Sequence, residues 1–139
     1  MMDTHVAKQL MDHEGVRLKP YRCPAGRLTI GCGRNLDDKG MTYEEAYFLL
    51  MNDIAECQND LKSIFPYFFD LSDGRRFALT DLRFNVGSAG FRGFKRLIDA
   101  IKRGNWSEAA AELKDSAWWH QVQETRRNKL YQQMLTGVA

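Results

Sequence analysis

The feature that most constrains the fold is the uneven distribution of chain-breaking residues. Prolines and glycines crowd into residues 20–33, where they interrupt short runs of strand-forming side chains. From residue 43 onward, apolar side chains instead recur every three or four positions, which is typical of amphipathic helices. This contrast predicts an α+β chain that is mostly helical, with one small β region near its N-terminus.

The β region is expected between residues 17 and 36. Turns are predicted at residues 24–26 and after Gly31, which favours a hairpin or a small meander. A helix from Asp3 to His13 is expected before this region, because its apolar residues follow helical spacing, and Gly15 is a suitable stop.

A long helix is predicted to follow Gly40. Thr42 and Glu45 have the spacing of a capping box, in which each side chain accepts a hydrogen bond from the other residue's backbone amide. We expect one apolar stripe of this helix to face the core, and its members are Tyr43, Tyr47, Leu50, Ile54, Cys57 and Leu61.

The rest of the chain predicts further helices. They are expected at about residues 72–86, 91–101 and 107–113, and from residue 118 or 120 to about 135. Ser107 is the expected cap of the helix at 107–113. The breaks between them lie at residues 87–90 and at Gly104. Because Pro66 interrupts the long helix, we predict a single domain with an N-terminal lobe of about residues 1–65 and a C-terminal lobe of about 66–139. A cleft between such lobes would be a natural binding site.

Composition narrows the functional classes. The chain has 139 residues, which corresponds to about one domain. Its 20 Lys and Arg against 18 Asp and Glu leave a net charge of +2, which does not indicate nucleic-acid binding. The apolar stretches are too short for a membrane span, and the N-terminus shows no secretory h-region. We therefore expect a cytoplasmic protein whose three cysteines are free thiols.

Three residues of the β region and its flank suggest chemistry. A partly desolvated Glu14 at the end of the first helix could hold a proton and act as a general acid. Thr29, in an extended segment, has a hydroxyl that could hold a water molecule. The alternative is that Glu14 is a solvated helix end and Thr29 an ordinary strand residue. Cys23 with His13 or His120 would formally allow a cysteine hydrolase.

The residues around this group resemble a known family. The stretches 13–21 and 26–33 resemble the catalytic region of the phage lysozymes of the T-even type, the endolysins of glycoside hydrolase family twenty-four. Eight residues separate Glu14 from Cys23 and five separate Cys23 from Thr29, which matches the family's triad of Glu, Asp or Cys, and Thr.

The likeness continues downstream. Residues 75–94 look like the family's central helices and the turn between them, and residues 106–110 and 116–119 look like later segments of its C-terminal lobe. The resemblance implies a two-lobed lysozyme-like fold, with a small β region in the N-terminal lobe and a helical C-terminal lobe. It also implies that the substrate is bacterial peptidoglycan, cut at the β-1,4 bond between N-acetylmuramic acid and N-acetylglucosamine for lysis of the host.

The resemblance assigns roles to individual residues. Glu14 would be the proton donor to the glycosidic oxygen, and Thr29 would help to position the attacking water. Either Arg126 or Arg127 would match a cleft arginine that pairs with the catalytic Glu. The positions that would contact sugar are Asn35, Phe84, Leu97 and Glu112.

Cys23 departs from the relatives that have Asp at this position. The resemblance leaves open whether its thiol is a base, a nucleophile or a dipole that orients water, and the neighbouring Arg22 and Arg27 could shift it toward a thiolate. No cofactor is implied. A holin would be the functional partner that releases the enzyme to the cell wall, and a monomer is expected. A wall-binding domain that keeps the fold without catalysis is the alternative function.

Overall fold

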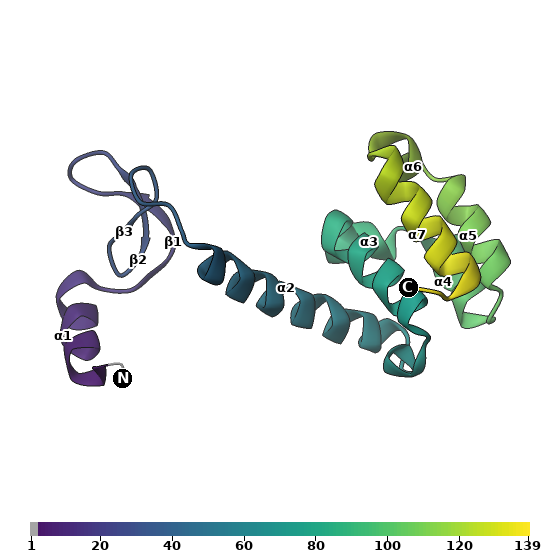
Figure 1. Ribbon diagram of the computed structural model, residues 1–139, viewed down its shortest axis with the longest axis horizontal. Helices are drawn as coiled ribbons and strands as arrows, with labels where there is room; N and C mark the ends of the chain where they lie inside the picture. The colour runs from purple at the N-terminus through teal and green to yellow at the C-terminus, as the bar shows by residue number, and fades with distance from the viewer. Residues whose placement is uncertain (1–2) are drawn as a thin grey trace. The chain divides into compact units, whose positions relative to one another are not determined.

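The computed structural model describes residues 3–139, which form two compact units (Figure 1). One unit extends to Phe48 and the other spans residues 49–139. The chain is mostly helical with one small antiparallel sheet, which confirms the predicted α+β class. Over the described residues, no helix combines the length and the apolar character that crossing a membrane requires.

The N-terminal unit begins with helix α1 (Thr4–Glu14). The Asp3 carboxylate caps this helix by accepting hydrogen bonds from two backbone amides, and Gly15 ends it with a φ of 73°. Three strands follow: β1 (Arg17–Arg22), β2 (Leu28–Gly31) and β3 (Arg34–Asn35). They pair antiparallel in the order β1-β2-β3, so the predicted meander is confirmed.

Helix α2 (Tyr43–Ile64) begins in the N-terminal unit and continues into the C-terminal unit. Its capping box is confirmed, because Thr42 N donates to Glu45 Oε1 at 2.9 Å and Glu45 N donates to Thr42 Oγ1 at 3.1 Å. The division between the compact units falls inside this helix, between Phe48 and Leu49. The predicted lobe boundary at residues 65–66 lies just after the C-terminal end of the helix.

Only two of the six residues in the predicted core-facing stripe of α2 are buried, and Ile54 is partly buried. Cys57 and Leu61 are buried, but Tyr43, Tyr47 and Leu50 are exposed. The spacing of the stripe is regular along the whole helix. Burial follows the packing instead, because only the second half of α2 has its apolar side chains in the core of the C-terminal unit.

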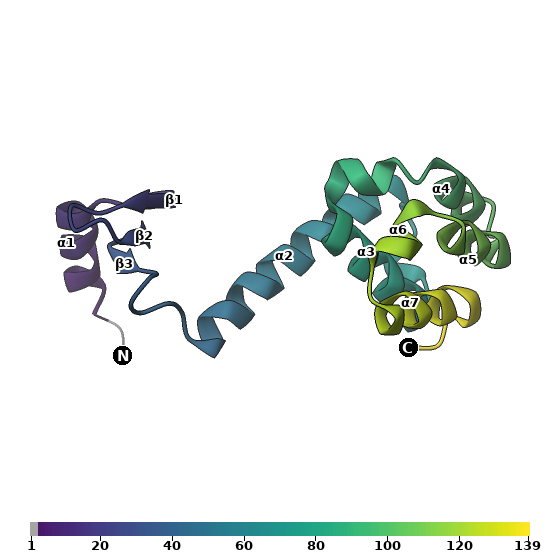
Figure 2. The ribbon, with the colours of Figure 1, turned by 90° about the horizontal axis from the view of Figure 1, so that it is seen from above.

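The C-terminal unit consists of residues 49–64 of α2 and the helices that follow. They are the 3-10 helix η1 (Phe68–Asp70), α3 (Asp73–Arg92), α4 (Lys95–Lys102), α5 (Trp106–Lys114), α6 (Ala117–Gln121) and α7 (Glu124–Thr136). Helix α3 packs against α7, and α5 packs against both α4 and α7 (Figure 2).

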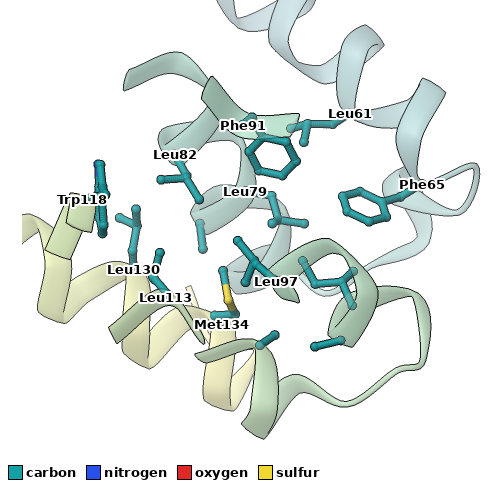
Figure 3. Close-up of a cluster of buried hydrophobic side chains, with 14 of the residues drawn as sticks. Leu61, Phe65, Leu79, Leu82, Phe91, Leu97, Leu113, Trp118, Leu130 and Met134 are labelled. Carbon is teal, nitrogen blue, oxygen red and sulfur yellow. The ribbon is translucent and has the colours of Figure 1, made fainter. Parts of the chain in front are cut away.

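These helices enclose one continuous core of aliphatic and aromatic side chains (Figure 3). Leu79 of α3 and Met134 of α7 are fully buried in it. Phe65 and Phe91 meet edge to face, with ring centroids 6.3 Å apart. Burial of these apolar side chains is the main source of stability for the unit.

The break predicted after residue 86 is confirmed at Gly87, where a φ of 78° and a ψ of 173° interrupt the helix. Helical backbone then resumes and continues to Arg92, so the break is shorter than the predicted stretch 87–90. Arg83 before the break and Arg92 after it both bind the Asp60 carboxylate of α2, each with a closest N–O distance of 2.7 Å. The two guanidinium groups hold the pKa of Asp60 well below its usual range, with the hydrogen bond from Arg92 the largest cause.

Two helix boundaries differ from the prediction. Asn105, not Ser107, caps α5, because its side chain accepts a hydrogen bond from Glu108 N at 3.1 Å. The last predicted helix is divided into α6 and α7, with Val122 and Gln123 in extended backbone between them.

Candidate active site

The turn between β1 and β2 places Cys23 at the end of the hairpin. Cys23 N donates to Arg27 O at 3.0 Å, and Gly26 N donates to Cys23 O at 2.8 Å. Gly26 has a φ of 78°, a conformation that favours glycine. The tight turn therefore brings the amides that follow Cys23 back toward its side chain.

Those amides change the acidity of the thiol. Hydrogen bonding from the backbone of Arg27 is the largest cause holding the pKa of Cys23 below its usual value, and the Ala25 backbone and the Thr29 side chain act in the same direction. Partial burial of the side chain opposes this effect and raises the pKa. The arrangement thus favours a thiolate more than an ordinary exposed cysteine does.

The sequence had pointed to arginine side chains as the cause of such a shift. In the structure, the Arg22 guanidinium lies 3.6 Å from the Asp37 carboxylate, and the Arg27 guanidinium lies 3.6 Å from that of Asp38. Both cations are thus engaged by carboxylates. The backbone of Arg27 acts on Cys23, not its charged side chain.

Thr29 lies on the central strand, with Tyr21 opposite it on β1 and Asn35 opposite it on β3. It is 3% exposed and is the one buried residue of the stretch 3–48. Its hydroxyl donates to Arg27 O at 2.8 Å and also faces the Cys23 thiol. A hydroxyl has a single proton, so Thr29 can serve one of these acceptors at a time and still accept a hydrogen bond from water.

Glu14 ends α1 and is exposed, rather than partly desolvated as the sequence had suggested. Its carboxylate lies over Gly33, in the turn between β2 and β3. A Cβ atom built at Gly33 would be 3.3 Å from Glu14 Oε2, and Gly33 has a φ of 78°. Glycine at this position therefore leaves room for the carboxylate and also permits the turn.

Asp37 is a residue of this region that sequence reasoning missed. Its carboxylate accepts a hydrogen bond from Leu28 N at 2.7 Å, at the start of the strand that carries Thr29. Leu36 N donates to Leu28 O at 2.7 Å from the same segment. Nothing local in the sequence shows this bond, because donor and acceptor are nine residues apart.

The N-terminal unit therefore gathers four of the predicted site residues. Cys23, Thr29 and Asn35 share the sheet and its hairpin turn, and Glu14 contacts the following turn through Gly33. The other three predicted sugar-contact residues, on α3, α4 and α5, and the two candidates for the cleft arginine, on α7, belong to the C-terminal unit.

Phe84 of α3 is 44% exposed and lines a hollow of about 350 Å³ in the C-terminal unit. The walls are mostly apolar, and Arg126 lies among the lining residues. Arg126 is bound to Asp81 with N–O distances of 2.6 and 2.7 Å. Arg127 instead donates to Trp119 O at 3.0 Å and lies over the Trp119 ring.

Leu97 and Glu112 line a second hollow of the same unit, between α4 and α5. Leu97 is 1% exposed and packs into the core, so its side chain offers little surface to a ligand. Glu112 is partly exposed. Within residues 3–139, no three His, Cys, Asp or Glu side chains come together as metal ligands would.

The amino-acid sequence is similar to those of known phage lysozymes and related proteins. A family model described as phage lysozyme matches residues 11–133. The endolysin of Acyrthosiphon pisum secondary endosymbiont phage 1 is 35% identical over 73% of this chain and 69% of its own length. A probable T4-type lysozyme of Dictyostelium discoideum is 26% identical over 99% of this chain and 97% of its own length.

One relative is much longer. The pre-baseplate central spike protein Gp5 of Enterobacteria phage T4 is 28% identical over 95% of this chain, but the match covers only 28% of Gp5. The shared region is therefore one part of a larger phage protein in that case.

Proposed function

This chain belongs to the phage lysozyme family, and on that premise we propose that it is an endolysin that hydrolyses bacterial peptidoglycan. The bond cut is the β-1,4 bond between N-acetylmuramic acid and N-acetylglucosamine, and the biological result is lysis of the host cell. The chain acts as a monomer, and a holin gives it access to the wall.

In this mechanism Glu14 donates a proton to the glycosidic oxygen as the bond breaks. General acid catalysis of this kind contributes roughly 10²–10⁴-fold to the rate. The position of Glu14 beside Gly33 supports the role, because the carboxylate lies at the turn between β2 and β3 and remains open to a substrate.

Thr29 and Cys23 act on the water that attacks the sugar. The observation that carries the proposal is their shared hydrogen-bond system at the hairpin turn, in which the Thr29 hydroxyl and the Arg27 amide both face the Cys23 sulfur. A lowered pKa lets the Cys23 thiol ionise more readily, and the resulting thiolate can accept a proton from water while the Thr29 hydroxyl fixes the water's orientation. Cys23 thereby takes the place of the carboxylate that relatives carry.

The test is incubation of the purified chain with peptidoglycan and measurement of new reducing ends. We expect the wild-type chain to release them and Glu14→Gln to lose nearly all release while its circular dichroism spectrum and unfolding curve are unchanged. Most of the activity surviving in a folded Glu14→Gln variant would remove Glu14 from the mechanism. Release of peptide amines instead of reducing sugars would indicate a cysteine hydrolase, and binding without any cleavage would indicate the wall-binding alternative.

Variants of the other two residues separate their roles. Thr29→Val keeps the volume and β-branching but removes the hydroxyl, so we expect a large fall in turnover. Cys23→Asp should remain active, Cys23→Ala should lose most activity, and partial activity of Cys23→Ser would favour orientation of water over base chemistry. Wild-type rates in Cys23→Ala would show that the thiol has no catalytic part.

A further inference from the structure

The peptide group between Arg27 and Leu28 connects the two residues that are proposed to act on water. Its carbonyl oxygen, Arg27 O, accepts hydrogen bonds from Cys23 N at 3.0 Å and from the Thr29 hydroxyl at 2.8 Å. A peptide group is planar, so a partner bound to its N–H also fixes the direction in which its carbonyl points. The partner of Leu28 N therefore bears on how both site residues are held.

That partner is the Asp37 carboxylate. Its Oδ2 accepts from Leu28 N at 2.7 Å, a distance typical of a bond to a charged acceptor. Leu36 N donates to Leu28 O at 2.7 Å, which continues the antiparallel pairing of β2 with β3. In a regular ladder Leu28 N would return this bond to Leu36 O. The Asp37 side chain takes the N–H instead, so a carboxylate stands in for a backbone carbonyl at the start of β2.

The same carboxylate also contacts the other side of the turn around Cys23. Arg22 ends β1, and its Nη1 lies 3.6 Å from Asp37 Oδ2 and donates to Gly26 O at 3.2 Å. Cys23 follows Arg22 directly in the chain. Asp37 thus binds the strand that enters the turn and the peptide group that leaves it.

We propose that Asp37 is a positioning residue: by fixing this peptide group, its carboxylate holds Cys23 and Thr29 in the arrangement that acts on water. This role rests on the proposed function. Asp37 acts through the backbone and takes no part in the bond-breaking step. A hydrogen bond to the N–H also polarises the carbonyl of the same peptide group, which strengthens the bonds that this oxygen accepts.

The charge of Asp37 and its position predict opposite changes in the Cys23 thiol. A nearby carboxylate disfavours a thiolate, so removal of the charge alone should lower the pKa of Cys23, and an Arg22 guanidinium freed from its partner would add to this effect. If Asp37 instead holds the turn, its removal weakens the hydrogen bonds from the Arg27 and Ala25 backbone that lower this pKa, and the pKa rises. The charged side chains of residues 22–28 and 35–38 are Arg22, Arg27, Asp37 and Asp38.

The first measurement is the rate at which iodoacetamide alkylates Cys23 from mildly acidic to alkaline pH, followed on the Cys23 peptide by mass spectrometry. The midpoint of this profile reports ionisation of the thiol, and its plateau reports access to the thiol. We expect Asp37→Ala to move the midpoint upward, with roughly threefold less thiolate at neutral pH. Asp37→Asn keeps an oxygen that can accept from Leu28 N, so its midpoint should stay close to that of the wild type.

The second measurement separates kcat from KM for the release of reducing ends from peptidoglycan. Asp37→Ala should lower kcat about tenfold and change KM little, because misplaced groups slow the chemical step. The matched control is Asp38→Asn, which removes the same charge one residue away. The Asp38 carboxylate binds the side chains of Arg27 and Asn35 rather than the peptide group, so this variant should not raise the midpoint.

A midpoint that falls or stays unchanged in Asp37→Ala would overturn the proposal, as would an equal rise in Asp38→Asn or a raised midpoint with unchanged kcat. Circular dichroism checks folding. Asp37→Ser, whose short side chain suits a turn, carries the same test if Asp37→Ala loses folded structure. Failure of the proposed function is seen separately, because a wild-type chain that releases no reducing ends still gives the alkylation profiles.

Discussion

The two units of this protein are stabilised in different ways. The C-terminal unit surrounds a continuous cluster of buried apolar side chains, including Phe65, Leu79 and Met134. Between residues 3 and 48, Thr29 alone is buried, and α1 contains no buried residue. The N-terminal unit depends instead on turns, helix caps and ion pairs such as that between Arg34 and Glu45.

The unit with little buried core is also the one that contains the proposed catalytic residues. Glu14, Cys23 and Thr29 all belong to the unit with little core. Exposed, hydrogen-bonded backbone leaves side chains open to a substrate, and functional loops are commonly drawn from the less stable parts of a protein. The C-terminal unit contributes most of the buried surface and hence most of the hydrophobic stabilisation.

The largest expected effect comes from breaking the core. Leu79→Ala removes a fully buried side chain, so we expect a loss of about 2–5 kcal/mol in the free energy of unfolding. Leu18 of β1 is 85% exposed, and Leu18→Ala should change stability by less than about 0.5 kcal/mol. Urea unfolding of both variants measures the contrast. A similar cost for the two leucines would show that the units do not differ as described.

The cysteines give a second contrast, in reactivity. The pKa of Cys23 is lowered chiefly by the Arg27 backbone, whereas burial raises the pKa of Cys57 in the C-terminal unit. Because the thiolate is the reactive species, iodoacetamide at neutral pH should label Cys23 at least about tenfold faster than Cys57. Mass spectrometry of the peptides at successive times gives the two rates. Faster labelling of Cys57 would mean that the core opens more readily than the hairpin turn rearranges.

The smallest expected effect concerns the helix caps. Thr42→Ala removes a cap in the N-terminal unit and Asn105→Ala removes one in the C-terminal unit, and each should cost about 1 kcal/mol. Native-state hydrogen exchange can show where each loss is felt. We expect Thr42→Ala to lower protection near the start of α2 and Asn105→Ala to lower it in α5. Loss of protection throughout the chain in both variants would indicate that the units unfold together.

Much of this architecture could be predicted from the sequence. Local signals located the cap of α2 and the turn at Gly26, because each depends on a few adjacent residues. They also located the interruption of α3 at Gly87. They did not show that Asp60, distant in sequence, binds both Arg83 and Arg92 on either side of this break.

The candidate site likewise has features that the sequence could predict and features that it could not. Glu14, Cys23 and Thr29 were identified by spacing and family resemblance, but the role of Gly33 beside Glu14 was not, because the contact joins a helix end to a separate turn. The apolar stripe on α2 shows a local pattern that did not predict burial along the whole helix. Its spacing is regular, yet only Cys57 and Leu61 are buried.

Local sequence signals were therefore enough to predict the mostly helical α+β class, the hairpin turn at Gly26 and the cap of α2, and they supplied the residue types available for catalysis. These follow from backbone preferences and side-chain chemistry within a few neighbouring positions. Packing in the folded chain, rather than local sequence, explains why the buried residues of α2 lie in its second half, why the Arg27 backbone and not its guanidinium acts on Cys23, and why Asp37 binds the start of β2. Such contacts join groups that are separated along the chain, so their partners are defined only once the chain has folded.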